Sequence, residues 1–117
     1  MVPALFEDRH ASVRAQAAVW AVDHSNPSVL MALLSLLNDA NALCRFMAQN
    51  ALVRLGSDVV PPLVAVLSSH TARQVEAALA VAIELSDARC LPPALTLCHD
   101  VSPRIRALAA TLLCTLG

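Results

Sequence analysis

The stretch Asp39-Ala-Asn-Ala-Leu-Cys44-Arg45-Phe-Met-Ala48 contains the pattern that decides the fold. An Asp is followed six residues later by an Arg, with an apolar residue just before the Arg and an Ala three residues after it. The pattern recurs in residues 8–17 and 100–109, and a degenerate copy in residues 68–77 has Gln74 in place of the Arg. A spacing of about thirty residues indicates an internal repeat, which is typical of a solenoid of stacked units.

Each repeat is expected to hold two helices, an Ala-rich first helix that carries the Arg and a Leu/Val-rich second helix. The Asn26-Pro27 pair supplies an N-cap and a first-turn proline for one second helix, and Gly56 is suited to end a first helix. Thr71, Asp87 and Ser102-Pro103 are expected to start later helices. The expected helices cover residues 13–22, 27–38, 42–55, 59–67, 72–85, 90–98 and 103–116.

The sequence therefore predicts an all-α fold, a right-handed α-solenoid or alpha-alpha superhelix of stacked helix pairs. The successive anchors leave no room for a linker, so a single domain is expected over residues 1–117. Its approximate repeats are residues 8–38, 39–67 and 70–98, with a partial repeat at 100–117.

These motifs, with the Val-Pro-Pro-Leu and Leu-Pro-Pro-Ala openings of two second helices, resemble the HEAT-repeat superfamily, within the ARM/HEAT-like class. The closest resemblance is to the short phycobilisome-lyase type of repeat found widely in bacteria. The resemblance implies that each Asp caps its first helix and meets Arg side chains of the same or the adjacent repeat. The structural ladder implied in this way comprises Asp8, Arg14, Asp39, Arg45, Asp100 and Arg106.

The composition narrows the range of partners. All eight basic residues are Arg and the formal net charge is -1, which disfavours nucleic acid. Uninterrupted apolar runs such as 77–83 are far shorter than the ~18 residues of a membrane span, and no signal peptide is evident. A cytoplasmic protein that does not bind membranes is expected. Hydrophobic residues make up 57% of the chain and charged residues 15%, so some apolar surface is expected to stay exposed.

No residue pattern points to catalysis, a cofactor or a metal ion. The cysteines at 44, 90, 98 and 114 have no CxxC spacing and are expected to be buried, reduced thiols. The histidines at 10, 24, 70 and 99 all fall at expected turns or helix ends, which does not bring them together around a metal. No glycine-rich loop or activated nucleophile is recognisable. We therefore expect a chain that is not an enzyme.

The second helices are unusual because they contain no charged residue. In HEAT arrays these helices line the concave face that commonly receives partners, so a neutral to apolar concave stripe is expected. Its outward positions are either merely small and neutral or part of a hydrophobic partner groove. The candidate partner-binding residues are Ser35, Asn38, Ala65, Ser68, Thr96 and His99.

The three aromatic residues, Phe6, Trp20 and Phe46, are expected to pack in the core. Trp20 has the alternative of acting as an exposed interface anchor. The function expected overall is a non-catalytic HEAT-repeat scaffold that binds another protein of unknown identity through its concave face. The alternatives are a homo-oligomer formed through uncovered terminal helices, and a lyase or enzyme accessory subunit.

Overall fold

The structure is a computed structural model, and it describes residues 4–68 and 71–117. These residues form an all-α solenoid with no β-strand among them. Four first helices alternate with three second helices, and short 3-10 helices precede or join some of them. The first helices are α1 (Ala11–Ala21), α3 (Ala42–Leu55), α5 (Ala72–Leu85) and α7 (Pro103–Leu116). The second helices are α2 (Pro27–Leu36), α4 (Val60–Leu67) and α6 (Leu91–Leu97), and the 3-10 helices are η1 (Ala4–Glu7), η2 (Gly56–Val59) and η3 (Ala88–Cys90).

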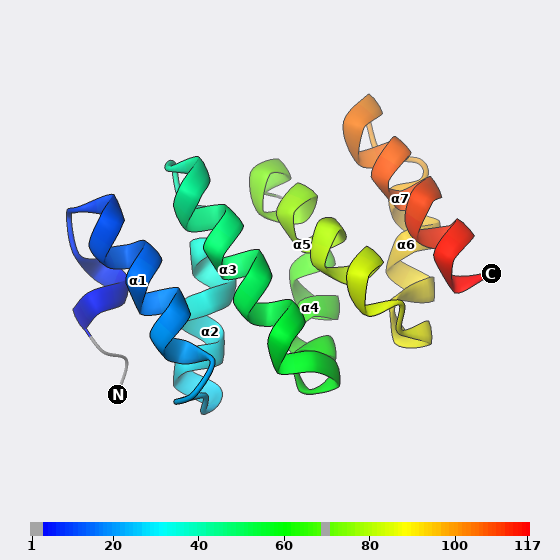
Figure 1. The fold of residues 1–117 in the computed structure, drawn as a ribbon. Helices are drawn as coiled ribbons and strands as arrows, with labels where there is room; N and C mark the ends of the chain where they lie inside the picture. Colours follow the sequence, from blue (N-terminus) through cyan, green and yellow to red (C-terminus); the bar gives the residue numbers. More distant parts are fainter. Residues whose placement is uncertain (1–3, 69–70) are drawn as a thin grey trace.

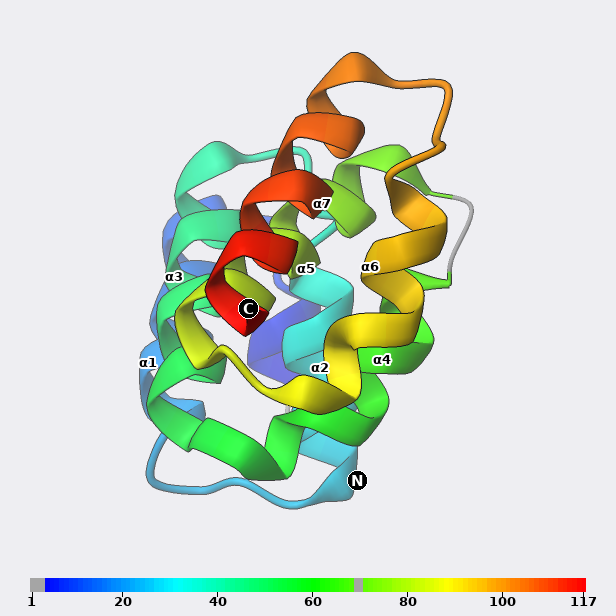
Figure 2. The same cartoon turned by 90° about the vertical axis from the view of Figure 1, so that its right-hand side faces the viewer.

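The helices form two layers. Figure 1 shows α1, α3, α5 and α7 side by side in the front layer, with α2, α4 and α6 behind them. The view along the stack in Figure 2 shows the two layers apart. Neighbouring first helices pack closely against one another, and each second helix packs against the first helix that follows it in the chain. Residues thirty positions apart in the sequence therefore become neighbours in space.

The helix boundaries follow from local chemistry. Asn26 caps α2 by accepting a hydrogen bond from the Val29 N–H at 2.9 Å, and Pro27 occupies the first turn, as predicted. Gly56 ends α3 with a φ of 77°, a conformation that costs glycine little. Between the expected helices 42–55 and 59–67 the structure has the 3-10 helix η2, which leads directly into α4.

The core lies between the layers. Alanines such as Ala17, Ala48 and Ala78 are fully buried and allow the first helices to approach closely. Leucines such as Leu33 and Leu63, from the second helices, fill the space between the layers. Burial of each such leucine stabilises the fold by about 1.5–3 kcal/mol. The small residues of one layer and the large residues of the other thus make a single continuous core.

One described helical run, from Ala42 to Leu67, is long and apolar enough to cross a membrane by length and composition alone, although the sequence led us to expect none. In the fold this run changes direction through η2 at Gly56. Its two parts, α3 and α4, lie in different layers. The run contributes buried residues from both helices, including Leu52 and Leu63, to the core.

Candidate functional site: the repeat ladder and the second-helix face

The Asp of each motif shapes the turn that precedes a first helix. Oδ1 of Asp8, Asp39 and Asp100 accepts a hydrogen bond from the backbone N–H two residues later, at 2.8, 2.8 and 2.9 Å respectively. This is an Asx turn. The N-cap residues are His10, Asn41 and Ser102, so the expectation that the Asp itself caps the helix was wrong. The Asp lies two residues too early, and its short side chain reaches the turn instead of the first helical N–H groups.

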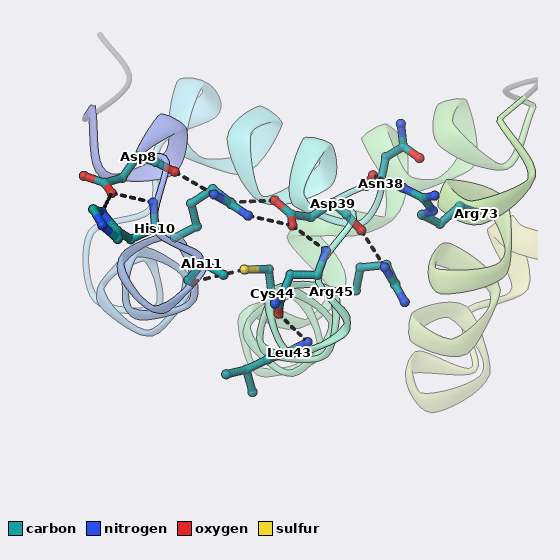
Figure 3. A network of polar contacts seen from close by, with 11 residues as sticks. Asp8, His10, Ala11, Asn38, Asp39, Leu43, Cys44, Arg45 and Arg73 are labelled. Atoms are coloured by element: carbon teal, nitrogen blue, oxygen red, sulfur yellow. Dashed lines mark hydrogen bonds and ion pairs between the residues drawn. The ribbon is translucent and has the colours of Figure 1, made fainter.

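The Arg of each motif closes the same turn from the helix. Nη1 of Arg14 donates to the Asp8 carbonyl oxygen at 2.7 Å, and Nη1 of Arg45 donates to the Asp39 carbonyl at 2.6 Å. Arg106 repeats the contact with the Asp100 carbonyl at 2.8 Å. The six-residue spacing therefore places each guanidinium on the backbone of its own Asp. Figure 3 shows the first two of these contacts in line.

Among the motif arginines of the described chain, Arg14 also binds the carboxylate of the next repeat. Arg14 donates from Nε and Nη2 to the Asp39 carboxylate of the next repeat, at 2.7 and 3.1 Å (Figure 3). Both side chains are largely buried, with exposed fractions of 19% for Arg14 and 11% for Asp39. Such a bidentate pair is stronger and more directional than a neutral hydrogen bond. We call this pair the inter-repeat rung.

The rung shifts the pKa of each partner. Burial raises the pKa of Asp39, but the hydrogen bonds from Arg14 and from the Asn41 N–H, with the Arg14 charge, outweigh burial and lower it overall. The hydrogen bond to Asp39 raises the pKa of Arg14. Cys44 lies beside the rung and donates from Sγ to the Ala11 carbonyl at 3.2 Å. Burial, and then the Asp39 charge, raise the pKa of the Cys44 thiol, which keeps it protonated and unreactive.

The third repeat replaces the ladder with different contacts. First helices begin at residues 11, 42, 72 and 103, so the motif Arg corresponds by helix start to Val75, and Gln74 lies one residue too early. Gln74 donates from Nε2 to the Leu34 carbonyl at 2.9 Å, and Arg73 donates from Nη1 to the Asn38 carbonyl at 3.2 Å. These two side chains satisfy carbonyls at the C-terminal end of α2. Arg45 has no carboxylate partner within the described part of the chain.

The titratable residues do not gather into a site. Within residues 4–68 and 71–117, no three His, Cys, Asp or Glu side chains could hold one metal ion. His10, His24 and His99 are exposed at turns, as predicted, whereas His70 lies outside the described residues. Cys44 and Cys90 are buried, but Cys98 is half-buried and Cys114 is exposed, so the expectation of four buried thiols was wrong for the last two. Cys114 lies on the same exposed side of α7 as Ala107 and Ala110.

The second helices present a neutral outer surface. All six candidate partner-binding residues are exposed. The hydroxyls of Ser35, Ser68 and Thr96 donate to carbonyls one helical turn earlier, so they offer an incoming partner oxygen lone pairs. We define the second-helix face by its exposed residues Met31, Ser35, Asn38, Ala65, Ser68, Leu95, Thr96 and His99.

A groove opens between α2 and the segment from η2 to α4, and Met31 belongs both to this groove and to the second-helix face. The groove encloses about 440 Å³ and is lined mainly by apolar atoms of Leu30, Met31, Val59 and Pro62, with Asp58 at its edge. Met31 is 59% exposed, which is high for a large apolar side chain. The groove is of a size and polarity that an apolar side chain from a partner could fill.

The sequence did not indicate a second groove, which lies on the first-helix layer. It encloses about 580 Å³ and runs across α1, α3 and α5, with Phe46, Arg54 and Glu84 in its lining. Phe46 is 56% exposed, so the expectation that it packs in the core was wrong. The residue after the motif Arg is Ala in residues 8–17 and 100–109 but Phe46 here, and this departure was the available signal.

Trp20 is half-buried and takes part in a small aromatic cluster. Its ring meets that of Phe6 edge to face at 6.5 Å and stacks on that of His24 at 4.3 Å. Phe6 is buried, as predicted. These contacts attach η1 to α1.

Repeated helix pairs, with Asx turns and arginines linking successive units, define an α-solenoid protein. A family model described as HEAT repeats matches residues 1–84, and the chain belongs to this family. HEAT repeats generally serve as scaffolds for protein interaction and are typically non-catalytic. The structure continues the same arrangement through α6 and α7, beyond the matched residues. No match was found among curated proteins.

Proposed function

We propose that this chain binds a partner protein across the second-helix face. The observation that carries the proposal is that three consecutive second helices contain no charged residue, and that two of them, α2 and α6, leave large apolar side chains exposed. Met31, Leu91 and Leu95 are 59%, 42% and 52% exposed. Apolar surface on these helices favours burial against another protein, because the helices themselves bring no ionic group that has to be desolvated. Asp58, from η2, is the charged residue in the lining of the groove.

The binding mechanism proposed is rigid presentation. The second helices are held by the close-packed first helices, so their outer residues keep a fixed spacing and lose little conformational entropy on binding. An apolar side chain of the partner would fill the groove beside Met31 and Leu30. The exposed hydroxyl oxygens and the Asn38 amide would accept or donate hydrogen bonds around it.

The four cysteines form no disulfide and two are buried, which supports a further proposal that the protein works in a reducing, cytoplasmic compartment.

The test compares two double variants of equal added charge. Ala65→Arg with Thr96→Arg places two charges on the second-helix face, at exposed helical positions that tolerate Arg without unfolding. Asn50→Arg with Thr111→Arg is the matched control, at exposed positions of the first helices α3 and α7. Each protein serves as bait in a lysate, and any protein captured by the wild type is purified and titrated against all three.

We expect the face variant to weaken binding by about 100-fold or more and the control to bind as the wild type does. The same loss in both variants would indicate non-specific charge repulsion and would reject the face. Loss in the control alone would move the binding surface to the first-helix groove. Circular dichroism and thermal unfolding establish that each variant is folded.

A further inference from the structure

Arg106 on α7 is the equivalent of Arg14, the arginine of the inter-repeat rung. Arg106 repeats the turn contact of Arg14, since its Nη1 donates to the carbonyls of Asp100 and Val101. Nε and Nη2 of Arg14 also bind the next carboxylate, whereas those of Arg106 have no partner among residues 4–68 and 71–117. Arg106 therefore makes the turn contact of Arg14 but has no carboxylate partner among the described residues.

The matching acceptor lies at the other side of the stack, on Asp8. Oδ1 of Asp8 accepts the His10 N–H at 2.8 Å, as Oδ1 of Asp39 accepts the Asn41 N–H. The Asp8 side chain is 37% exposed, against 11% for Asp39. Its only other partner within the described chain is the exposed His10 ring, at 3.2 Å. The carboxylate is thus fixed by the same turn but receives no guanidinium.

The helix surfaces beside these two groups also correspond. Ala15 and Ala18, one and four residues after Arg14, are 3% and 0% exposed where α3 packs on α1. Their equivalents, Ala107 and Ala110, follow Arg106 at the same intervals and are exposed. Small residues of this kind allow a helix to approach closely, as the alanines of the first-helix layer do. The outer side of α7 therefore has the surface onto which a further first helix can pack.

The outer side of α1 carries exposed apolar residues around a hollow. A hollow of about 510 Å³ lies beside η1 and α1 and is lined by Leu5, Val13, Val19 and Trp20, among others. Leu5 and Val19 are 43% and 46% exposed. Phe6 is buried two residues before Asp8, just as Leu37 is buried two residues before Asp39. The segment from η1 through Asp8 to α1 thus repeats, in shortened form, the segment from α2 through Asp39 to α3.

We propose that two copies of this chain stack head to tail, with Asp8 of one copy binding Arg106 of the other. The incoming α1 packs on the exposed alanines of α7, in the way that α3 packs on α1 within the chain. Asp8 and Arg106 have complementary charges and lie in equivalent turns at the two sides of the stack, which favours a second copy of this chain as the occupant. Because the two surfaces differ, the contact is heterologous and leaves further ends open, so dimers grow into longer linear species. This contact is independent of the second-helix face.

The test is light scattering coupled to size exclusion over a protein concentration series, at low and at high salt. The wild type is expected to shift from monomer to dimer and longer species as concentration rises, with weaker association in high salt. Arg106→Gln is expected to weaken association about tenfold by removing the charged rung. Ala110→Arg is expected to abolish association, because the long side chain blocks close helix approach while Arg106 remains.

Charge-reversal variants test whether Asp8 of one copy binds Arg106 of the other. Asp8→Arg and Arg106→Asp are each expected to be monomeric alone, and to associate when mixed because Arg106 of the first then meets Asp8 of the second. Ala65→Arg with Thr96→Arg is the control and is expected to associate as the wild type does. Strictly monomeric wild type at millimolar concentration would overturn the proposal. Association that survives Ala110→Arg, or that only the control variant abolishes, would also overturn it. Circular dichroism establishes that each variant is folded.

Discussion

Asp39 and Asp100 occupy equivalent positions in the repeat and differ in their neighbours. Each accepts the N–H two residues later, and each offers its carbonyl oxygen to the Arg six residues on. Only Asp39 also receives the guanidinium of the preceding repeat, from Arg14. The preceding repeat of Asp100 has Val75 at the corresponding place by helix start. The motif thus determines the turn, whereas the adjacent repeat determines whether the turn also bears a link between repeats.

The largest effect is expected from removing the carboxylate of the inter-repeat rung. Asp39→Ala leaves the largely buried Arg14 guanidinium and the Asn41 N–H without their acceptor, which should lower the free energy of unfolding by about 2–3 kcal/mol. Asp100→Ala loses one turn hydrogen bond, from the Ser102 N–H, and should cost about 1 kcal/mol. Urea unfolding of both variants measures the difference. Equal losses would show that the rung contributes no stability beyond the turn.

The pH dependence of stability should separate this rung from an exposed ion pair. The pKa of Asp39 is lower in the folded state than the usual 3.8, so the unfolded chain takes up the proton first as pH falls. The contribution of Asp39 is therefore fully present above pH 3.8 and is lost as pH falls through its lowered value. Asp39→Asn should remove this part of the acid destabilisation in urea titrations between about pH 5 and pH 2.

Asp87 provides the matched comparison. The hydrogen bond from Arg89 lowers the pKa of Asp87 to about 2, yet this pair joins residues of one turn at the surface. The Asp87–Arg89 pair contributes to the free energy of unfolding, and this contribution is lost over the same acidic range. It should be strongly reduced in 0.5 M salt, because exposed ion pairs are screened. The contribution of the less exposed Asp39 should persist. If Asp87→Asn and Asp39→Asn respond alike to salt, the rung is not shielded from solvent.

The sequence predicted those parts of the fold that depend on local chemistry. The predicted helices 42–55 and 72–85 match α3 and α5 to the residue, because Gly56 and Thr71 mark a helix end and a helix start. The contact partners of individual side chains in the folded chain could not be predicted. Whether Arg14 meets its own Asp or the next one, and whether Phe46 is covered, depends on how adjacent helices pack.

The candidate site also combines features that the local sequence predicts with features that depend on helix packing. A helical period and the absence of charge were enough to select six outward residues on the second helices, and all six are exposed. A hydrophobic groove on the second helices was one of two alternatives that the sequence left open. The position of neither groove was predicted, because a hollow arises from the distance between helices that are far apart in the sequence. Met31 and Phe46 contribute to grooves in different layers although both belong to apolar helical stretches.

The smallest effect is expected where the third repeat substitutes other contacts for the ladder. Gln74→Ala removes the hydrogen bond to the Leu34 carbonyl, so it should cost about 0.5–1.5 kcal/mol, less than Asp39→Ala. Glu76→Gln is the control, since it removes an ion pair with Arg104 whose Arg side chain is 75% exposed, and it should change stability by at most about 0.5 kcal/mol. Urea unfolding measures both. A loss for Gln74→Ala as large as that for Asp39→Ala would mean that one neutral hydrogen bond joins the repeats as strongly as the charged rung. The ladder motif would then mark the turns without determining how strongly adjacent repeats are held together.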